Sequence, residues 1–367
     1  MKKIAVYFLF LFAGSWLLIV FPSCKKSSND SGSSVISYSK ITYLGTTNLS
    51  VARTLMVGAS AGNKIVFAGG YNTTSDFNTV DIYDVATGTW TASQLSESKY
   101  GLSAGTYDNL IYFGGGWTPG GVVSKVVDIY NTKSQSWTSS LLSQPRGDLA
   151  GTSIGQYVMF AGGWGLGGES NVVDILNAGT ETWTTGFLSE AREYPAATSC
   201  GTKMFIAGGE TGVSIYSDAV DIFDYQTGLW TYDHLSFGRG QMVAATSGSK
   251  VFFAGGHNND SLFSRVDIYD INTKNWAVTF LSKARNYITA ASAGNLVIFA
   301  GGLTPAGSVG TIDVYNVSTG KWTTASLSIP RFELTAVACG NKILIAGGTT
   351  NISTGAVSAA VDVFQAE

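Results

Sequence analysis

The chain has 367 residues, only 13% of them charged, and a net charge of −3. Soluble domains average roughly 25% charged residues, and the lack of a basic surplus argues against a nucleic-acid partner. Glycine is frequent, at 45 residues, and so are Val, Ile, Thr, Tyr and Trp, which favours short strands and tight turns over helices.

The amino terminus has the pattern of an export signal. Two lysines follow the first methionine, an uninterrupted apolar run covers residues 4–21, and FPSC ends at Cys24. A cysteine at this place resembles the lipid-attachment site of bacterial lipoproteins. Phe21 and Pro22, shortly before the cysteine, depart from that pattern, which usually has aliphatic and small residues there. The resemblance implies lipidation at Cys24 and a location at the bacterial cell envelope, as an outer-membrane lipoprotein facing the periplasm or the surface. An uncleaved anchor is the alternative, because the apolar run is just long enough to span a bilayer.

The stretch after the cysteine is polar and begins CKKSSNDSGSS. Such a composition is typical of a flexible tether. We therefore divide the chain into a signal peptide (residues 1–23), a tether (residues 24–38) and one folded domain (residues 39–367).

The folded domain is built from a repeat of 46 or 47 residues. In each repeat a short apolar run ends in two glycines, at Gly69-Gly70, Gly115-Gly116, Gly162-Gly163, Gly208-Gly209, Gly255-Gly256, Gly301-Gly302 and Gly347-Gly348. An aspartate in a VDIY-like run follows, then, in the first six repeats, a tryptophan nine residues later and a cation nine residues after that. A strand followed by glycines can begin a phosphate-binding loop. Seven copies argue against that, because one nucleotide needs a single loop.

Each repeat is predicted to contain four short strands: after the cation, before the glycines, around the aspartate and from the tryptophan onward. Four strands at this period predict a propeller blade. The paired glycines, a third-strand aromatic and the tryptophan resemble the kelch repeat, which implies an all-β, seven-bladed kelch-type propeller. The seventh repeat ends at Glu367 without its tryptophan strand. Residues 40–47 are therefore expected to supply that strand, closing the last blade and covering its edge.

The repeated cations and aspartates are expected at one face of the propeller, since alternating strands begin there. One alternative is an anion-binding mouth. The other is a set of buried ion pairs that join strands or blades, and the strict repetition favours this second alternative.

We expect the functional residues to stand at positions whose residue type differs from one repeat to the next. Trp117 and Trp164 directly follow a glycine pair in neighbouring blades, where the other blades have Tyr71, Glu210, His257, Leu303 and Thr349. The two residues after each cation also vary and include Tyr100, Asp148, Glu193, Tyr194, Gln241, Asn286, Tyr287, Phe332 and Glu333. Both sets belong to loops around one channel mouth. We predict a ligand site there, formed by Trp117, Trp164, Tyr71, Asp148, Glu193, Tyr194 and Glu210.

Exposed rings beside carboxyl and amide groups suit a sugar, whose apolar face packs on a ring while polar groups bind its hydroxyls. The same mixture suits a protein partner. The predicted function is a non-catalytic binding module at the cell envelope, with a glycan or an envelope protein as partner and a lipid anchor in the membrane.

No catalytic residue, metal or cofactor is predicted. The two histidines, His234 and His257, stand apart in the repeat, and a copper or zinc site needs several clustered nitrogen or sulfur ligands. A carboxylate pair such as Asp148 and Glu193 could perform acid–base chemistry on a sugar. By resemblance to periplasmic kelch proteins that act on sialic acid, a metal-free sugar isomerase or lyase is the alternative. An assembly scaffold is a third.

Overall fold

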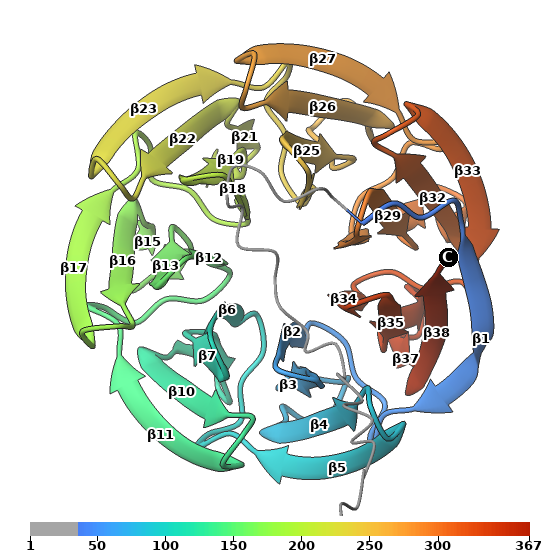
Figure 1. Cartoon of the computed structure of the whole chain (residues 1–367). Helices are drawn as coiled ribbons and strands as arrows, with labels where there is room; N and C mark the ends of the chain where they lie inside the picture. Colours follow the sequence, from blue (N-terminus) through green and yellow to red (C-terminus); the bar gives the residue numbers. More distant parts are fainter. Residues whose placement is uncertain (1–35) are drawn as a thin grey trace, which may run out of the picture.

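The computed structural model describes residues 36–367, where the regular structure consists of β-strands. Seven four-stranded antiparallel sheets stand radially around a central channel (Figure 1). The prediction of an all-β, seven-bladed propeller is confirmed. Within these residues, no helix has the length and apolar character that crossing a bilayer requires.

Six blades take their four strands from consecutive parts of the chain, in order from the channel outward. The first blade contains β2 (Val57–Ala61), β3 (Lys64–Ala68), β4 (Thr79–Asp84) and β5 (Thr89–Gln94), and the second contains β6 (Ser103–Tyr107), β7 (Leu110–Gly114), β10 (Val126–Asn131) and β11 (Ser136–Leu141). The third contains β12 (Ala150–Ile154), β13 (Tyr157–Ala161), β16 (Val172–Asn177) and β17 (Thr182–Phe187), and the fourth contains β18 (Ala196–Cys200), β19 (Lys203–Ala207), β22 (Ala219–Asp224) and β23 (Leu229–His234). The fifth contains β24 (Val243–Ser247), β25 (Lys250–Ala254), β26 (Arg265–Asp270) and β27 (Asn275–Phe280), and the sixth contains β28 (Thr289–Ala293), β29 (Leu296–Ala300), β32 (Thr311–Asn316) and β33 (Lys321–Ser326).

The seventh blade combines β34 (Thr335–Cys339), β35 (Lys342–Ala346) and β38 (Ala360–Ala366) with β1 (Ile41–Asn48). Short hairpins extend from the connection between the second and third strands of five blades. They are β8 (Trp117–Thr118) with β9 (Val122–Val123), β14 (Trp164–Gly165) with β15 (Gly168–Glu169), β20 (Glu210–Gly212) with β21 (Ile215–Tyr216), β30 (Leu303–Thr304) with β31 (Gly307–Ser308), and β36 (Thr349–Asn351) with β37 (Ala356–Val357).

The hydrophobic core lies between the blades. Residues 65–68 of β3 are completely buried, since neighbouring blades cover both faces of the sheet, and this strand therefore carries an unbroken apolar run. The tryptophan of the repeat packs near the outer edge. Trp137 lies on Tyr130, with ring centroids 4.8 Å apart, and its Nε1 donates to Ser93 Oγ of the preceding blade at 2.8 Å. It therefore connects adjacent blades.

The glycine pair occupies positions that no other residue fits. Gly69 and Gly70 have φ angles of 67° and 101°. A Cβ on Gly69 would lie 2.4 Å from the carbonyl oxygen of Lys99 in the next blade, and one on Gly70 would lie 2.6 Å from that of Thr54. Gly70 instead donates its N–H to the Lys99 carbonyl at 2.9 Å. The pair thus has a structural role where two blades meet.

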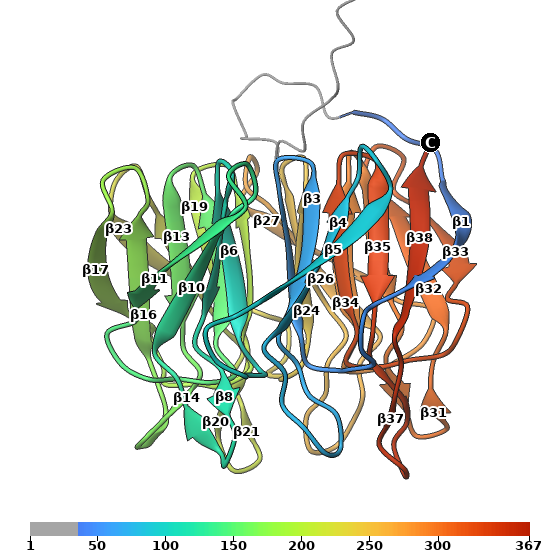
Figure 2. The same ribbon diagram turned by 90° about the horizontal axis from the view of Figure 1, so that it is seen from below.

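The two faces of the propeller differ. The short hairpins extend from one face, together with the links between blades, and we name it the mouth face (Figure 2). The described chain begins at the opposite face, where the N–H of Asn295 donates to Ile36 O at 3.1 Å and Asn295 Nδ2 donates to Tyr38 O at 3.0 Å. Residues 36–38, assigned to the tether by sequence, therefore contact the sixth blade. The predicted signal peptide and Cys24 lie outside the described residues.

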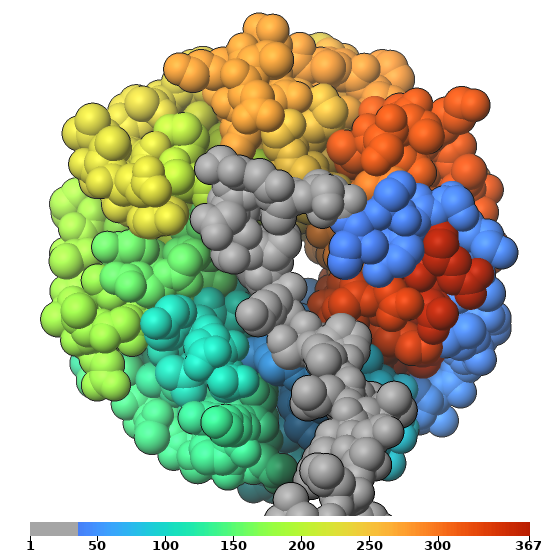
Figure 3. Space-filling model, viewed as in Figure 1, coloured from blue at the N-terminus to red at the C-terminus, as the bar shows by residue number. Residues whose placement is uncertain are grey.

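The last blade combines the two ends of the described chain. β1 pairs antiparallel with β38, from Ile41 opposite Ala366 to Asn48 opposite Ala360. Figure 3 shows the blue amino-terminal segment against the red last blade. The outer edge of β38 is therefore hydrogen-bonded. That this pairing keeps the ring closed stays a prediction.

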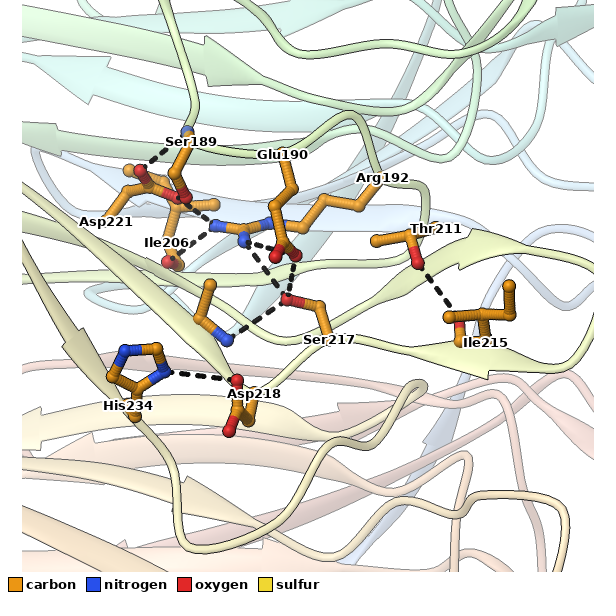
Figure 4. Close-up of polar contacts among 11 residues, drawn as sticks. Ser189, Glu190, Arg192, Ile206, Thr211, Ile215, Ser217, Asp218, Asp221 and His234 are labelled. Carbon is orange, nitrogen blue, oxygen red and sulfur yellow. Dashed lines mark hydrogen bonds and ion pairs between the residues drawn. The ribbon is translucent and has the colours of Figure 1, made fainter.

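The repeated cations and aspartates are buried. In the fourth blade, Arg192 forms an ion pair with Asp221 and its Nη2 donates to Ile206 O at 3.1 Å (Figure 4). The N–H of Ser189 donates to Asp221 at 2.8 Å. Equivalent ion pairs join Arg53 to Asp81, Lys99 to Asp128, Arg146 to Asp174, Arg239 to Asp267, Arg285 to Asp313 and Arg331 to Asp362. Of the two alternatives, buried ion pairs are observed, and these seven cations are 0% exposed.

Candidate functional site

The two variable sets of residues meet in one backbone pattern on the mouth face. The residue after the glycine pair exchanges two hydrogen bonds with the residue after the cation, as Trp117 and Tyr100 do at 2.8 and 3.0 Å. The same pairing recurs in the other six blades, as Tyr71–Thr54, Trp164–Gly147, Glu210–Glu193, His257–Gly240, Leu303–Asn286 and Thr349–Phe332. Side chains of the two sets therefore lie beside each other around the channel.

The residue two positions after each cation lies two positions before the start of the innermost strand of its blade. We name these residues the mouth ring: Leu55, Gly101, Asp148, Tyr194, Gln241, Tyr287 and Glu333. Backbone hydrogen bonds link members in neighbouring blades, from Asp148 N–H to Gly101 O at 2.9 Å and from Tyr194 N–H to Asp148 O at 3.1 Å. All seven have φ between 48° and 58°, and this left-handed conformation costs a residue with a Cβ roughly 1–2 kcal/mol. Such strain gathers at binding sites.

Asp148 is held by two aromatic side chains. Nε1 of Trp117 donates to its Oδ2 at 2.6 Å, and the hydroxyl of Tyr194 bonds to the same carboxyl group. Gly147 makes room for the indole, because a Cβ there would lie 2.4 Å from Trp117 Nε1. Burial raises the pKa of Asp148 to about 6, although both hydrogen bonds act in the opposite direction.

Three further carboxyl groups, those of Glu169, Glu193 and Glu210, accompany Asp148 in an acidic sector that spans the third and fourth blades. Burial, reinforced by the negative charges of the other three, raises the pKa of Glu193 to about 7. Burial also raises the pKa of Glu210, with Glu169 contributing. No cation within the described residues offsets these shifts. The acidic sector therefore attracts protons and cations.

Blades four to six carry a neutral polar network. The hydroxyl of Tyr216 lies 3.2 Å from His257 Nε2, and Asn286 Nδ2 lies 3.4 Å from His257 Nδ1 and 3.1 Å from Gln241 Oε1. Burial lowers the pKa of His257, so its imidazole is neutral at pH 7. Because Asn286 Nδ2 can only donate, Nδ1 accepts and Nε2 carries the proton. The Tyr216 hydroxyl proton is then available to a ligand.

A cavity of about 190 Å³ opens at the mouth face between the last blade and the first. We name it the Glu333 pocket. Both hydrogen bonds to the Glu333 carboxyl reach Oε2, from Thr54 Oγ1 at 3.2 Å and from Thr349 Oγ1 at 3.1 Å. Burial raises the pKa of Glu333, against the effect of these two bonds. Three aromatic side chains also line the pocket, those of Tyr71, Tyr287 and Phe332.

Comparison with known proteins agrees with this geometry. Residues 54–232 match the KLHDC2/KLHL20/DRC7 Kelch-repeats domain. This match covers slightly less than half of the chain. The chain is a seven-bladed β-propeller whose glycine–tryptophan repeats resemble the kelch repeat. The solved structure described as "Structure of YjhT" resembles this propeller with a TM-score of 0.60 and 17% sequence identity, covering 76% of this chain and 99% of the other. At that identity the likeness shows the fold alone. No curated protein matches the sequence.

Five of the seven predicted site residues lie together in blades two to four of the propeller: Trp117, Asp148, Glu193, Tyr194 and Glu210. Tyr71 lies apart, in the Glu333 pocket, with its ring centroid 5.0 Å from that of Tyr100. Trp164 pairs with Gly147 through its backbone, but its indole makes no ring contact or hydrogen bond within residues 36–367. At the sequence level, variation after a cation was the signal for Glu333, Gln241 and Asn286. Variation after the glycine pair was the signal for His257, and no pattern indicated Tyr216.

Proposed function

We propose that this propeller is a non-catalytic, carbohydrate-binding module of the bacterial cell envelope, and that it binds its ligand at the mouth face. The observation that carries the proposal is the Glu333 pocket. Three aromatic side chains, one carboxyl group and two threonine hydroxyls meet there in one cavity. A sugar presents an apolar C–H face and several hydroxyls, and it needs this combination of ring surface and hydrogen-bonding groups.

The size of the pocket favours one sugar unit. Pockets for drug-sized ligands have volumes of roughly 300–1,000 Å³, and this cavity has about 190 Å³. The terminal residue of a glycan fits such a volume, with the rest of the glycan extending over the mouth. The neutral network of His257, Asn286 and Gln241 adds groups beside the pocket, including Asn286 Oδ1, which is buried without a hydrogen-bond partner in the described chain.

The position of the amino terminus is compatible with an envelope module. The described chain begins at the face opposite the mouth (Figure 2). A lipid on Cys24 would therefore be joined to the domain at the face opposite the mouth, and the mouth itself would stay accessible to a glycan.

A glycan array followed by calorimetry on the detergent-solubilised full-length protein tests the proposal. Tyr71→Ala removes a ring from the pocket and should weaken binding of an identified glycan about tenfold, since anchoring aromatics contribute more than about 1 kcal/mol. Tyr232→Ala is the matched control, because Tyr232 is 60% exposed on the outer strand β23 and should leave binding unchanged. Absence of any carbohydrate binding, or equal effects of the two substitutions, would overturn the proposal.

A metal-free sugar isomerase or lyase is the second candidate, and the acidic sector favours it. The pKa values of Asp148 and Glu193, about 6 and about 7, suit a general acid and a general base near neutral pH. Incubating bound sugars with the protein and following them by NMR tests this candidate. Turnover by the wild type that is lost in Asp148→Asn, with binding retained, would establish catalysis, and unchanged sugars would exclude it.

A further inference from the structure

We propose that the Glu333 pocket selects a sugar bearing a free primary amine, bound as its ammonium ion between Glu333 and the surrounding rings. This inference rests on the proposed carbohydrate-binding function and names the class of sugar.

The first observation is the arrangement around the Glu333 carboxyl group. Thr349 Oγ1 donates to Oε2, and the single hydroxyl proton of Thr54 is shared between Oε2 at 3.2 Å and the backbone carbonyl of Glu333 at 3.0 Å. Oε2 is thus occupied and the side chain is fixed in position, while Oε1 receives no hydrogen bond from the described chain. An ammonium group has three N–H donors and no acceptor, so it complements a carboxylate oxygen held in this way.

The second observation is the nature of the other walls. Aromatic faces attract cations through their ring quadrupole when the cation lies within about 6 Å. The rings of Tyr287 and Phe332 are 6.0 Å apart and both line the pocket, and Tyr71 lies across from them on the first blade. Among residues 36–367, no lysine or arginine lines the cavity, so no cation of this part of the chain would compete with a bound ammonium or attract a carboxylate or phosphate.

The third observation is the charge of the whole mouth. The acidic sector and Glu333 give the mouth face several carboxyl groups, and the repeated cations beneath it are 0% exposed and paired with aspartates. The resulting negative field raises the local concentration of cationic ligands. The same negative field weakens the binding of acidic sugars. We therefore expect an amino sugar to bind more tightly than a neutral sugar, and a neutral sugar to bind more tightly than an anionic one.

Calorimetry on the detergent-solubilised full-length protein tests this order with four sets of probes. They are glucosamine, galactosamine and mannosamine; the parent hexoses; the N-acetylated forms, which lack the charge; and n-butylamine, which lacks the sugar. At pH 7, at least one amino sugar should bind tenfold or more tightly than its parent hexose and its N-acetylated form. Butylamine should bind at least tenfold more weakly than that amino sugar.

Two charge-matched variants localise the effect. Glu333→Gln keeps an oxygen to accept the threonine hydroxyls and should abolish the preference, so that amino sugar and hexose bind equally. Asp260→Asn removes the same charge from an exposed connection on the mouth face, outside both the pocket and the acidic sector, and should preserve the preference.

Equal binding of amino sugar and hexose by the wild type would overturn the inference and leave carbohydrate binding standing. Loss of the preference in both variants would also overturn it, because the effect would then belong to the general field. Tight binding of butylamine would show that the pocket recognises amines without a sugar. Failure of every sugar to bind would refute the proposed function itself.

Discussion

Asp148→Asn should make the protein more stable at pH 8 and leave its stability nearly unchanged at pH 4. The carboxyl group is half-buried, and burial raises its pKa from 3.8 to about 6. In the unfolded chain the pKa returns to its ordinary value, so the folded protein binds the proton more tightly than the unfolded chain does. The stabilisation that comes from this tighter proton binding is therefore fully present below pH 4. It is lost as the pH rises from about 4 to 6, and it stays absent above that range.

The magnitude follows from the shift. About two pKa units at roughly 1.4 kcal/mol each give an upper bound of about 3 kcal/mol. Solvent reaches part of the group and screens it, which reduces the expected effect to about 1–2 kcal/mol. Asparagine keeps an oxygen that can accept the 2.6 Å bond from Trp117 Nε1, so the substitution removes the charge without removing its partner.

Urea denaturation at pH 4, 6 and 8 and constant ionic strength measures the effect. The control is Asp84→Asn at the opposite face, where burial would raise the pKa of the carboxyl but bonds from Lys64 and from backbone N–H groups lower it. That variant should lose stability above pH 4, the opposite sign. Parallel pH profiles for the wild type and Asp148→Asn would refute the view that Asp148 is a buried, uncompensated carboxyl group.

Three further predictions concern the anchor, the closing strand and the tryptophans. Cys24→Ala should release the protein from membranes or block its processing, and membrane retention with an intact amino terminus would instead indicate an uncleaved anchor. Deleting residues 39–47 removes β1 and should cause aggregation or a large fall in Tm, whereas a monomer with the wild-type Tm would contradict closure by this strand. Trp137→Ala should destabilise by roughly 3–5 kcal/mol in denaturant titrations, because it removes a core ring; Trp164→Ala should stay within about 0.5 kcal/mol, and equal losses would place Trp164 in the core.

The fold could be predicted because its defining contacts recur between the same positions of every repeat. Arg53 Nε donates to Gly69 O at 2.8 Å across sixteen residues, and Arg239 Nε donates to Gly255 O at 3.0 Å across the same interval. A contact between fixed positions of one blade produces a fixed spacing in the sequence, and seven copies make that spacing visible. The ion pairs share this property, which is why strict repetition indicated a structural role for the cations.

The candidate site could be predicted only in part, because its contacts join different repeats. Trp117 belongs to the second blade, whereas its partner Asp148 begins the third. Thr54 and Glu333 are 279 residues apart and meet only where the ring closes. Residue types at these positions follow no spacing rule, and neither burial nor a left-handed φ is visible in the sequence. Variation at the mouth therefore pointed to the mouth face as a whole but not to the Glu333 pocket.

The mouth ring shows how this fold separates architecture from recognition. Glycine at each ring position would relieve roughly 1–2 kcal/mol of backbone strain, yet only Gly101 is a glycine. A Cβ at that one position would lie 2.6 Å from Asp148 Oδ1 and 3.2 Å from the indole of Trp117, so a side chain there would displace the hydrogen-bonded pair of Trp117 and Asp148. At the other six positions a side chain is present despite the strain, although the backbone hydrogen bonds that link neighbouring members, such as Tyr194 N–H to Asp148 O, need no side chain. Those side chains therefore shape the mouth, and under the proposed function a ligand would be selected by which of them it touches.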